Sequence, residues 1–289
     1  MMRTDATTNG KPAAARDRRS SLGKQVLGKE VFGNEASVGG VVFGGDVVAP
    51  LSDPIHCDVP ALRGAEIAAV YYDRRMAGDF YEFLRVGPSR LLFALLDMAG
   101  RRTEIREPLI AAQQTFHTFA PTLFAGDDFN EATAMMELCR QINDTILRSG
   151  VRSCPAFMGC YNEDMGTVCY ANAGHTPALL RDHGGVTLLE STGLPLGLFS
   201  LATHSASACH LLPAATLLVV SRGIVEAECE GDEFGMDRTA QAFQRARGAS
   251  AHALCLDMLQ AVHDFTRTPP THNDVTALVL ARKNAAGSL

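Results

Sequence analysis

The sequence contains no apolar run that approaches the ~20 residues needed to span a bilayer. Its N-terminus is basic and polar, and no apolar stretch follows it, so it does not resemble a secretory signal. Lys and Arg number 26 against 32 Asp and Glu, a formal net charge of −6. That balance disfavours nucleic-acid binding, which needs clustered basic side chains. We therefore expect a cytoplasmic protein that binds neither membrane nor nucleic acid.

Motifs of zinc and thiol chemistry are also missing. None of the eight cysteines forms a C-x-x-C pair, and the nine histidines show no H-x-x-x-H or E-x-x-H spacing. No cysteine is followed by a Gly-rich phosphate loop ending in Arg, which disfavours a cysteine-dependent phosphatase. The neighbours of the cysteines are mostly apolar, so we interpret them as buried thiols in a reducing compartment.

Composition divides the chain into three parts. Residues 1 to about 30 are rich in Arg, Lys, Ala, Ser and Thr and predict a flexible arm. Residues 31–60 are rich in Gly and Val and predict an irregular lead-in or an edge ribbon. The pattern sharpens afterwards, so we predict an arm and lead-in over 1–60, a folded domain over 61–284 and a tail over 285–289.

Periodicity predicts the elements of the folded domain. Apolar or alternating runs predict strands over 67–72, 80–86, 91–96, 156–161, 167–171, 178–181, 186–189, 216–220 and 275–281. Helical spacing of apolar residues predicts one helix around 109–119, a second over 129–146, and two more over 236–247 and 251–265. For the second helix we expect a cap from Asp127-Asp128 and an end at Gly150. This order favours an α+β fold of antiparallel sheets covered by helices.

Two aspartates stand at strand ends in this pattern. Asp79 precedes the strand over 80–86, and Asp97 ends the apolar strand that a hairpin turn joins to it. Carboxylates suit hard cations, and a bridging aspartate can hold two ions about 3.5–4 Å apart. Asp is also common in turns, so the pair alone does not establish a metal site.

The order of several segments carries a more specific signal. The chain contains, in sequence, EIAAVYYDRRMAGDFYEF, LLFALLDMAG, YANAGHTPALL, GLPLGLF, SRGIVEAECEGDEFG and NDVTALVL. This series resembles the metal-dependent Ser/Thr protein phosphatases of the PPM type (type 2C fold), and within them the SpoIIE/RsbU-like bacterial branch. The resemblance implies a four-layer αββα sandwich with a binuclear Mn²⁺ or Mg²⁺ centre between two antiparallel sheets. It also implies a phosphoprotein substrate, usually a phosphorylated anti-sigma-factor antagonist with a STAS fold.

The resemblance assigns roles to individual residues. Asp79 matches the aspartate of the family's GGD segment, and Asp97 matches the metal-bridging aspartate, with the backbone carbonyl of Met98 as its companion ligand. His175 belongs to a matching AGH segment, which we interpret mainly as a structural turn. Ser221 lacks a nucleophile elbow, so a serine hydrolase is not indicated.

Other positions depart from the family pattern. The family's Thr-Asp-Gly is SRG here, so the permanent cation Arg222 stands at a ligand position. The acidic pair before the last strand begins with Asn273, which leaves Asp274 as a candidate ligand. Arg101 and Arg102 replace a His-Gly pair near the expected metals. They are candidate phosphate- or partner-binding donors, or simply solvated loop charges.

Arg222 allows two interpretations. Our hypothesis is that its guanidinium pairs with Asp97 and Asp79, an internal salt bridge in place of a metal. Alternatively the strand end is shifted and Arg222 lies in solvent, with Glu226 or Asp274 as a substitute ligand and some activity retained.

Two functions therefore remain open. One is a Mn²⁺- or Mg²⁺-dependent protein phosphatase with an impaired or rebuilt metal site. The other is a pseudophosphatase, a non-catalytic binding or regulatory module that needs no metal. Because neither a sensor domain nor a coiled-coil switch segment is recognisable, we expect regulation by a partner or by homodimerisation.

Overall fold

A computed structural model describes residues 38–40, 56–72, 78–100, 102–126, 129–267 and 274–284, with only the backbone for 38–40, 56–58, 72 and 102. By its internal contacts the chain divides into Met1–Ser37 and Val38–Leu289, and every described residue belongs to the second unit. The predicted domain limits at 60 and 284 stay predictions.

Five antiparallel strands form the sheet that carries both aspartates. Its order is β10-β7-β6-β5-β4. Hairpins join β4 to β5 and β6 to β7, whereas two helices lie between β5 and β6 in the sequence. Strand β5 and its neighbour β6 are buried along almost their whole length, as their continuous apolar runs predict. The strands are β4 (Asp79–Arg85), β5 (Arg90–Asp97), β6 (Ala156–Asn162), β7 (Thr167–Ala173) and β10 (Ser207–His210).

A second antiparallel sheet has the order β3-β14-β11-β8-β9. It places β14, the last strand in sequence, between β3, its first strand, and β11. The strands are β3 (Ala65–Tyr72), β8 (Ala178–Asp182), β9 (Gly185–Leu189), β11 (Thr216–Val220) and β14 (Val275–Arg282). Two short antiparallel pairs lie outside both sheets: β1 (Val38–Gly40) with β2 (His56–Asp58), and β12 (Glu228–Cys229) with β13 (Asp232–Glu233).

The helices begin and end at local signals. The N-cap of α3 is Asn130, whose Oδ1 accepts a hydrogen bond from the Thr133 amide at 2.9 Å, so the predicted cap at Asp127-Asp128 was wrong. Gly150 ends that helix in the left-handed conformation, as predicted. The helices are α2 (Arg102–Leu123), α3 (Glu131–Ser149), α4 (Arg222–Val225), α5 (Gly235–Arg245) and α6 (Ala251–Thr266).

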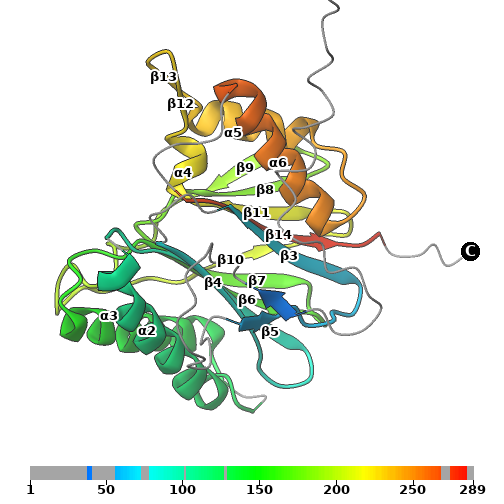
Figure 1. The fold of residues 1–289 in the computed structure, drawn as a ribbon. Coiled ribbons are helices and arrows are strands. Elements are labelled where there is room, and N and C mark those ends of the chain that lie inside the picture. Colours follow the sequence, from blue (N-terminus) through cyan, green and yellow to red (C-terminus); the bar gives the residue numbers. More distant parts are fainter. Residues whose placement is uncertain are drawn as a thin grey trace, which may run out of the picture. The chain divides into compact units, whose positions relative to one another are not determined.

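Three apolar cores separate four layers. Phe93 and Phe157 of the first sheet meet Leu217 and Leu278 of the second in the central core. A second core lies between the first sheet and α2 with α3, and a third between the second sheet and α5 with α6. Figure 1 shows this stacking, with one helix pair outside each sheet. The predicted αββα sandwich of antiparallel sheets is confirmed.

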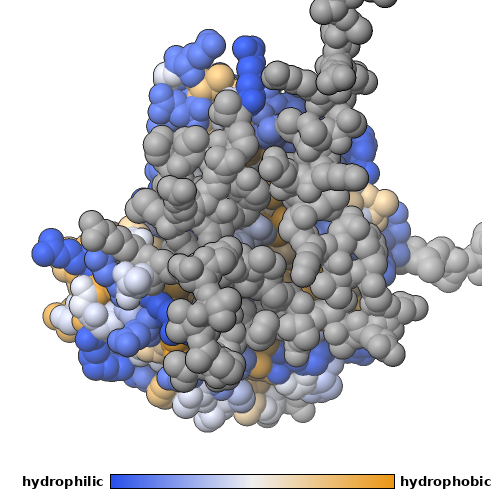
Figure 2. Space-filling view, viewed as in Figure 1, coloured by the Kyte–Doolittle hydropathy of each residue, from blue (hydrophilic) through white to orange (hydrophobic). Residues whose placement is uncertain are grey.

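The surface and the thiols agree with this arrangement. Hydrophilic side chains cover the visible region around β12 and β13 in Figure 2. No helix in the described part of the chain is long and apolar enough to cross a membrane. Five of the cysteines predicted as buried thiols are buried and free, and burial raises their pKa: Cys139, Cys154, Cys160, Cys169 and Cys255. The prediction was wrong for Cys209 and Cys229, which are only partly buried, and the Cys57 side chain lies outside the described part of the chain.

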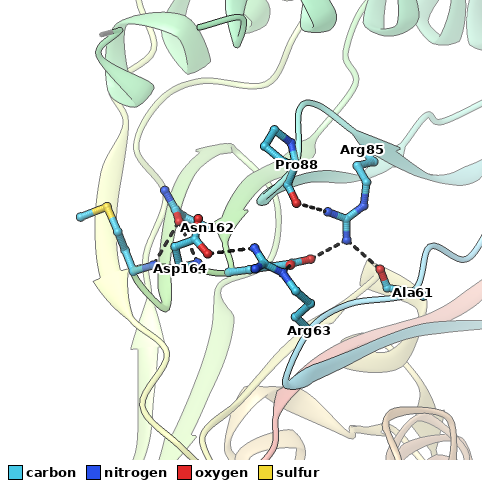
Figure 3. A network of polar contacts seen from close by, with 8 residues as sticks. Ala61, Arg63, Arg85, Pro88, Asn162 and Asp164 are labelled. Carbon is cyan, nitrogen blue, oxygen red and sulfur yellow. Dashed lines mark hydrogen bonds and ion pairs between the residues drawn. The ribbon is translucent and has the colours of Figure 1, made fainter. Parts of the chain in front are cut away.

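An ion-pair network links the two sheets at the end away from Asp79 and Asp97. Glu163, in the β6–β7 turn, accepts hydrogen bonds from Arg85 at the end of β4 and from Arg63 just before β3. Arg63 also pairs with Asp164 at 2.8 Å, and Arg85 donates to the Ala61 carbonyl at 2.7 Å (Figure 3). The Glu163 side chain is buried, so the network is a fixed connection rather than a surface pair.

Candidate functional site

Asp79 and Asp97 face each other across one antiparallel ladder. Asp79 is the first residue of β4, Asp97 is the last residue of β5, and the two are direct register partners. Directly opposite residues on one sheet face have Cβ atoms only ~4.5–5.5 Å apart. The hairpin predicted from the sequence therefore brings the two carboxylates together.

The second sheet supplies a third carboxylate. Asp274 lies just before β14, and its Oδ2 accepts hydrogen bonds from the backbone amides of Gly78 and, at 3.3 Å, of Asp79. Thr276 of β14 donates its hydroxyl to Asp79 Oδ2 at 2.6 Å. Asp274 is thus adjacent to the pair, with one of its oxygens held by the backbone amides of Gly78 and Asp79 at the start of β4.

Ser221 fixes the strand end beside these groups. Its amide donates to the Thr276 carbonyl at 3.0 Å, its Oγ accepts from the Thr276 amide at 3.0 Å, and its hydroxyl donates to the Asp274 carbonyl at 3.2 Å. The side chain is fully buried. Ser221 therefore acts as a structural clamp between β11 and β14, in agreement with the absence of a nucleophile motif.

Gly78 permits the close approach of the two strand ends. It accepts a hydrogen bond from the Met98 amide at 2.9 Å. A Cβ atom at this position would lie only 2.3 Å from the Met98 carbonyl oxygen. The glycine of the AGD segment is thus required by backbone contact, and the Met98 carbonyl predicted as a ligand lies beside it.

The Asp79 carboxyl group is electrostatically unfavourable as an anion. It points inward to the fully buried Thr276, although the residue as a whole is only half-buried. Burial raises its pKa well above the usual range, and the nearby negative charges of Asp97 and Asp274 raise it further. Hydrogen bonds from Ser221 and Thr276 lower it only in part. Two carboxylates this close favour either a shared proton or a cation between them.

Arg222 supplies a cation at this position. It begins α4, directly after Ser221, and its Nη2 lies 3.4 Å from Asp97 Oδ1. Its Nε lies 3.8 Å from Glu226 Oε2, one helical turn away. The arginine therefore points to the aspartates, as one of our two interpretations predicted, and the strand end is not shifted.

Two details of that interpretation were wrong. The Arg222 side chain is 42% exposed and is therefore not buried, whereas the Asp97 side chain is 9% exposed. Asp79 accepts a hydrogen bond from Thr276, and the described contacts of Arg222 are to Asp97 and Glu226 rather than to Asp79. Because the guanidinium is solvated on one side, the pair contributes at most about 1 kcal/mol to stability.

His175 lies near the candidate site, in addition to its place in a structural turn. Its side chain is buried, and its Nε2 has no hydrogen-bond partner within the described part of the chain. Burial lowers the pKa of the imidazole. The charge of Asp97 raises this pKa and the charge of Arg222 lowers it, so both charged groups influence the protonation of the ring. Its Nδ1 lies 3.2 Å from the Thr176 carbonyl, which favours a proton on Nδ1 and a lone pair on Nε2.

The remaining predicted site residues are only partly visible. Arg101 and Asn273 lie outside the described residues, and Arg102 is described only as the backbone start of α2. Their predicted roles in ligand or phosphate binding stay predictions. Glu226, considered as a substitute ligand, lies with its Oε2 3.8 Å from Arg222 Nε.

The groups present do not fit a two-metal centre. Within the described residues, no three His, Cys, Asp or Glu side chains are arranged to hold a metal ion. One oxygen of Asp97 is directed at a guanidinium, and one oxygen of Asp274 is engaged by backbone amides. A guanidinium has no lone pair to offer a cation and repels it. The geometry supports an ion pair where the resemblance implies metals.

Comparison with known structures identifies proteins with a similar fold. The structure is similar to the RsbU and RsbW domains of a Mycobacterium tuberculosis protein, with 22% identity and a TM-score of 0.66 over 79% of this chain and 64% of that one. It is also similar to the phosphatase domain and a regulatory fragment of SpoIIE from Bacillus subtilis, with 14% identity, a TM-score of 0.61, and 78% and 65% of the two chains covered. The chain thus spans less than two thirds of these two structures.

A third comparison covers more of the related structure. The PP2C domain of SiaA from Pseudomonas aeruginosa aligns with a TM-score of 0.62 and 14% identity, over 74% of this chain and 85% of that one. No curated protein sequence matched the chain.

The sequence itself identifies the family. Residues 88–283 match the family model described as stage II sporulation protein E (SpoIIE). The matched region begins just before β5 and ends just after β14, so it includes Asp97, Arg222 and Asp274. The chain therefore belongs to the SpoIIE family, the RsbU-like branch of the metal-dependent PP2C (PPM) protein phosphatases of bacterial signalling.

Proposed function

We propose that this chain is a pseudophosphatase of the SpoIIE family, a regulatory module that binds a signalling partner without hydrolysing its phosphate through a two-metal centre. The contact between the Arg222 guanidinium and the Asp97 carboxylate carries this proposal. Asp97 occupies the position that the family resemblance assigns to the metal-bridging ligand. Its partner in this chain is a permanent cation.

Coulomb's law explains why the pair opposes metal binding. A divalent ion ~4 Å from a guanidinium meets a repulsion of several kcal/mol at an effective ε of ~20. Solvent around the exposed side of Arg222 reduces this figure. The ion would also compete with the guanidinium for Asp97 Oδ1. Both effects weaken the affinity of the site for Mn²⁺ or Mg²⁺.

The proposed partner is a protein of the STAS class. The family resemblance implies a phosphorylated anti-sigma-factor antagonist of that fold. One similar structure contains an RsbU domain together with an RsbW domain. A location in the cytoplasm is part of the same proposal, and homodimerisation stays a prediction.

A second candidate is a weakened Mn²⁺- or Mg²⁺-dependent phosphatase of the same phosphoproteins. The proximity of three carboxylates, Asp79, Asp97 and Asp274, favours it, although in this structure they are not arranged around a common metal position. Their combined charge exceeds that of Arg222, so the site keeps an excess of negative charge when all three are ionised. If Arg222 turned into solvent, these side chains and Asn273 would be the candidate ligands.

Turnover of p-nitrophenyl phosphate by the purified protein, with and without Mn²⁺ or Mg²⁺, separates the two candidates. The proposal predicts no hydrolysis above that of the Asp97→Asn variant at millimolar metal. Metal-dependent hydrolysis that disappears in Asp97→Asn would establish the second candidate instead. Thermal unfolding of both proteins confirms that each is folded in the assay.

A further inference from the structure

An exposed apolar loop borders the candidate site. Large apolar side chains are exposed at ten described positions, and four of them fall within one eight-residue stretch between β9 and β10: Leu194, Leu198, Phe199 and Leu201. Phe199 is 56% exposed and Leu201 is 90% exposed. Single exposed apolar residues are ordinary on protein surfaces, but four within one short loop make it a candidate interaction surface.

Hydrogen bonds hold the backbone of this loop. Leu196 is buried and exchanges two backbone hydrogen bonds with Cys154, at 2.7 and 3.0 Å. Asn143 of α3 accepts from the Gly197 amide at 2.9 Å and donates to the Phe199 carbonyl at 3.2 Å. The loop therefore presents its apolar side chains from a fixed backbone, which lowers the entropy lost when a partner binds.

The same contacts join the loop to the site. Pro155, next to Cys154, accepts a hydrogen bond from the Asp97 amide at 2.8 Å. On the other side, a Cβ atom at Gly174 would lie 2.5 Å from the ring of Pro195, and His175 follows Gly174 directly. The loop is therefore linked to Asp97 through Cys154 and Pro155, and to His175 through Gly174.

Charge indicates what the loop can bind. Residues 191–203 contain no Asp, Glu, Lys or Arg. Among the described side chains of the site, Arg222 is paired with Asp97, and Asp79 and Asp274 are acidic, so these groups offer little attraction for a phosphate. Apolar contact with the loop would supply affinity that these groups do not.

The area of the loop favours a transient partner over a second copy of this chain. Large side chains of ~150–250 Å² that are exposed by 49, 39, 56 and 90% together present roughly 350–600 Å². A stable interface buries ~800 Å² on each side. The N-terminal arm is an unsuitable occupant, since it carries seven basic residues within its first 30 and the loop has no acidic side chain.

We propose that the loop from Leu194 to Leu201 is the docking surface for the partner protein, and that it receives an uncharged apolar patch beside the partner's phosphorylation site. This inference rests on the proposed function, because it assumes a protein partner at the Asp97–Arg222 site. To the proposed function it adds the surface from which affinity for the partner protein arises.

The test measures binding of a defined panel by calorimetry: the purified STAS-domain proteins of the same organism, each phosphorylated and unphosphorylated. Leu201→Asp places a charge at the most exposed position of the loop and is expected to weaken binding at least about tenfold. Phe199→Asp is expected to act in the same direction. Met165→Asp is the matched control. Met165 is 67% exposed and lies in the β6–β7 turn, at the end of β6 and β7 that is far from Asp97 and the loop.

Each outcome is decisive. Weakened binding in both loop variants, with unchanged binding in Met165→Asp and unchanged thermal unfolding, supports the docking surface. If the wild type binds a panel member and Leu201→Asp binds it equally well, the docking surface is wrong while the proposed function stands. If the wild type binds no member, the proposed partner class fails and the docking assignment fails with it. Loss of a wild-type dimer in Leu201→Asp, seen by sedimentation, would assign the loop to self-association instead.

Discussion

At the scale of single residues, the candidate site combines two neighbouring carboxylates, Asp79 and Asp97, with one cation, Arg222. The two carboxylates are forced together by strand register, and Arg222 neutralises only the more buried of them. Burial of the Asp79 carboxylate as an anion therefore remains energetically unfavourable, as its raised pKa indicates. Such unfavourable groups are retained at functional sites more often than elsewhere.

Replacing Asp79 by Asn should stabilise the protein at neutral pH. The pKa of Asp79 in the folded state lies above its unfolded value, so its contribution to stability is complete below the unfolded value and is lost as pH rises through the folded value. Asn has no charge to bury and can still accept the Thr276 hydrogen bond. We expect the melting temperature of Asp79→Asn to exceed that of the wild type at pH 7 and to lose this advantage near pH 4.

Glu190→Gln, which removes a carboxylate from an exposed position, is the control and should leave the melting temperature almost unchanged. Equal melting temperatures for Asp79→Asn and the wild type at pH 7 would show that the carboxylate carries no such cost.

At the scale of elements, most of the fold follows from sequence pattern. The buried runs of β5, β6, β11 and β14 were predicted within one or two residues, because apolar content and length alone identify a central strand. Strand β10 was missed because it is an exposed edge strand whose four residues do not alternate. Helix α4 and the β12–β13 pair were missed because elements of two to four residues carry no periodicity.

The link between α2 and β4 should depend on pH. Glu82 is buried on β4 and accepts from Gln113 at 2.7 Å, and His117 Nε2 lies 3.1 Å from the same oxygen. The hydrogen bond to Glu82 raises the pKa of His117. The stabilisation by the His117–Glu82 contact is therefore complete below ~6.5, the pKa of His117 in the unfolded chain, and is lost as pH rises through the pKa of His117 in the folded protein.

The wild type should therefore lose stability as pH rises above ~6.5, through the raised pKa of His117, and His117→Gln should not show this loss. The effect is below ~1 kcal/mol, because the ring is almost half exposed. Thermal unfolding of both proteins at a series of pH values measures it. Parallel curves for the two proteins over this range would contradict the link.

At the scale of the whole molecule, the two sheets meet at both ends through side chains far apart in sequence. The hydrogen bond from Thr276 to Asp79 spans 197 positions, and the one from Arg63 to Glu163 spans 100. Periodicity cannot predict such contacts. Asp79 and Asp97 could be paired from their hairpin alone, but Asp274 and Arg222 were placed beside them only through the family resemblance. The clamp formed by Ser221 had no sequence signal.

Removing Glu163 should loosen the end of the sandwich opposite the site. Burial alone would raise the pKa of Glu163, but the hydrogen bonds from Arg63 and Arg85 outweigh it and hold the pKa below its usual value. Its stabilisation is thus complete above the unfolded pKa of ~4.3 and is lost as pH falls through the folded value. Glu163→Gln should lower stability by about 1–3 kcal/mol at pH 7, measured by urea unfolding.

Asp164→Asn is the matched control for Glu163, since it removes an exposed carboxylate from the same turn and should cost less than about 1 kcal/mol. A larger loss from Asp164→Asn than from Glu163→Gln would reverse the roles assigned to the two acids.

The central claim, that an ion pair stands where the family holds metal, is tested most directly by titrating Mn²⁺ into the wild type and Arg222→Asp in a calorimeter. We expect weak or undetectable binding by the wild type and at least about tenfold tighter binding by Arg222→Asp, since the variant removes the repulsion and adds a carboxylate. Arg245→Asp, at an exposed position of α5, makes the same charge change away from the site and should bind like the wild type. Equal Mn²⁺ affinity in the wild type and Arg222→Asp would contradict the account.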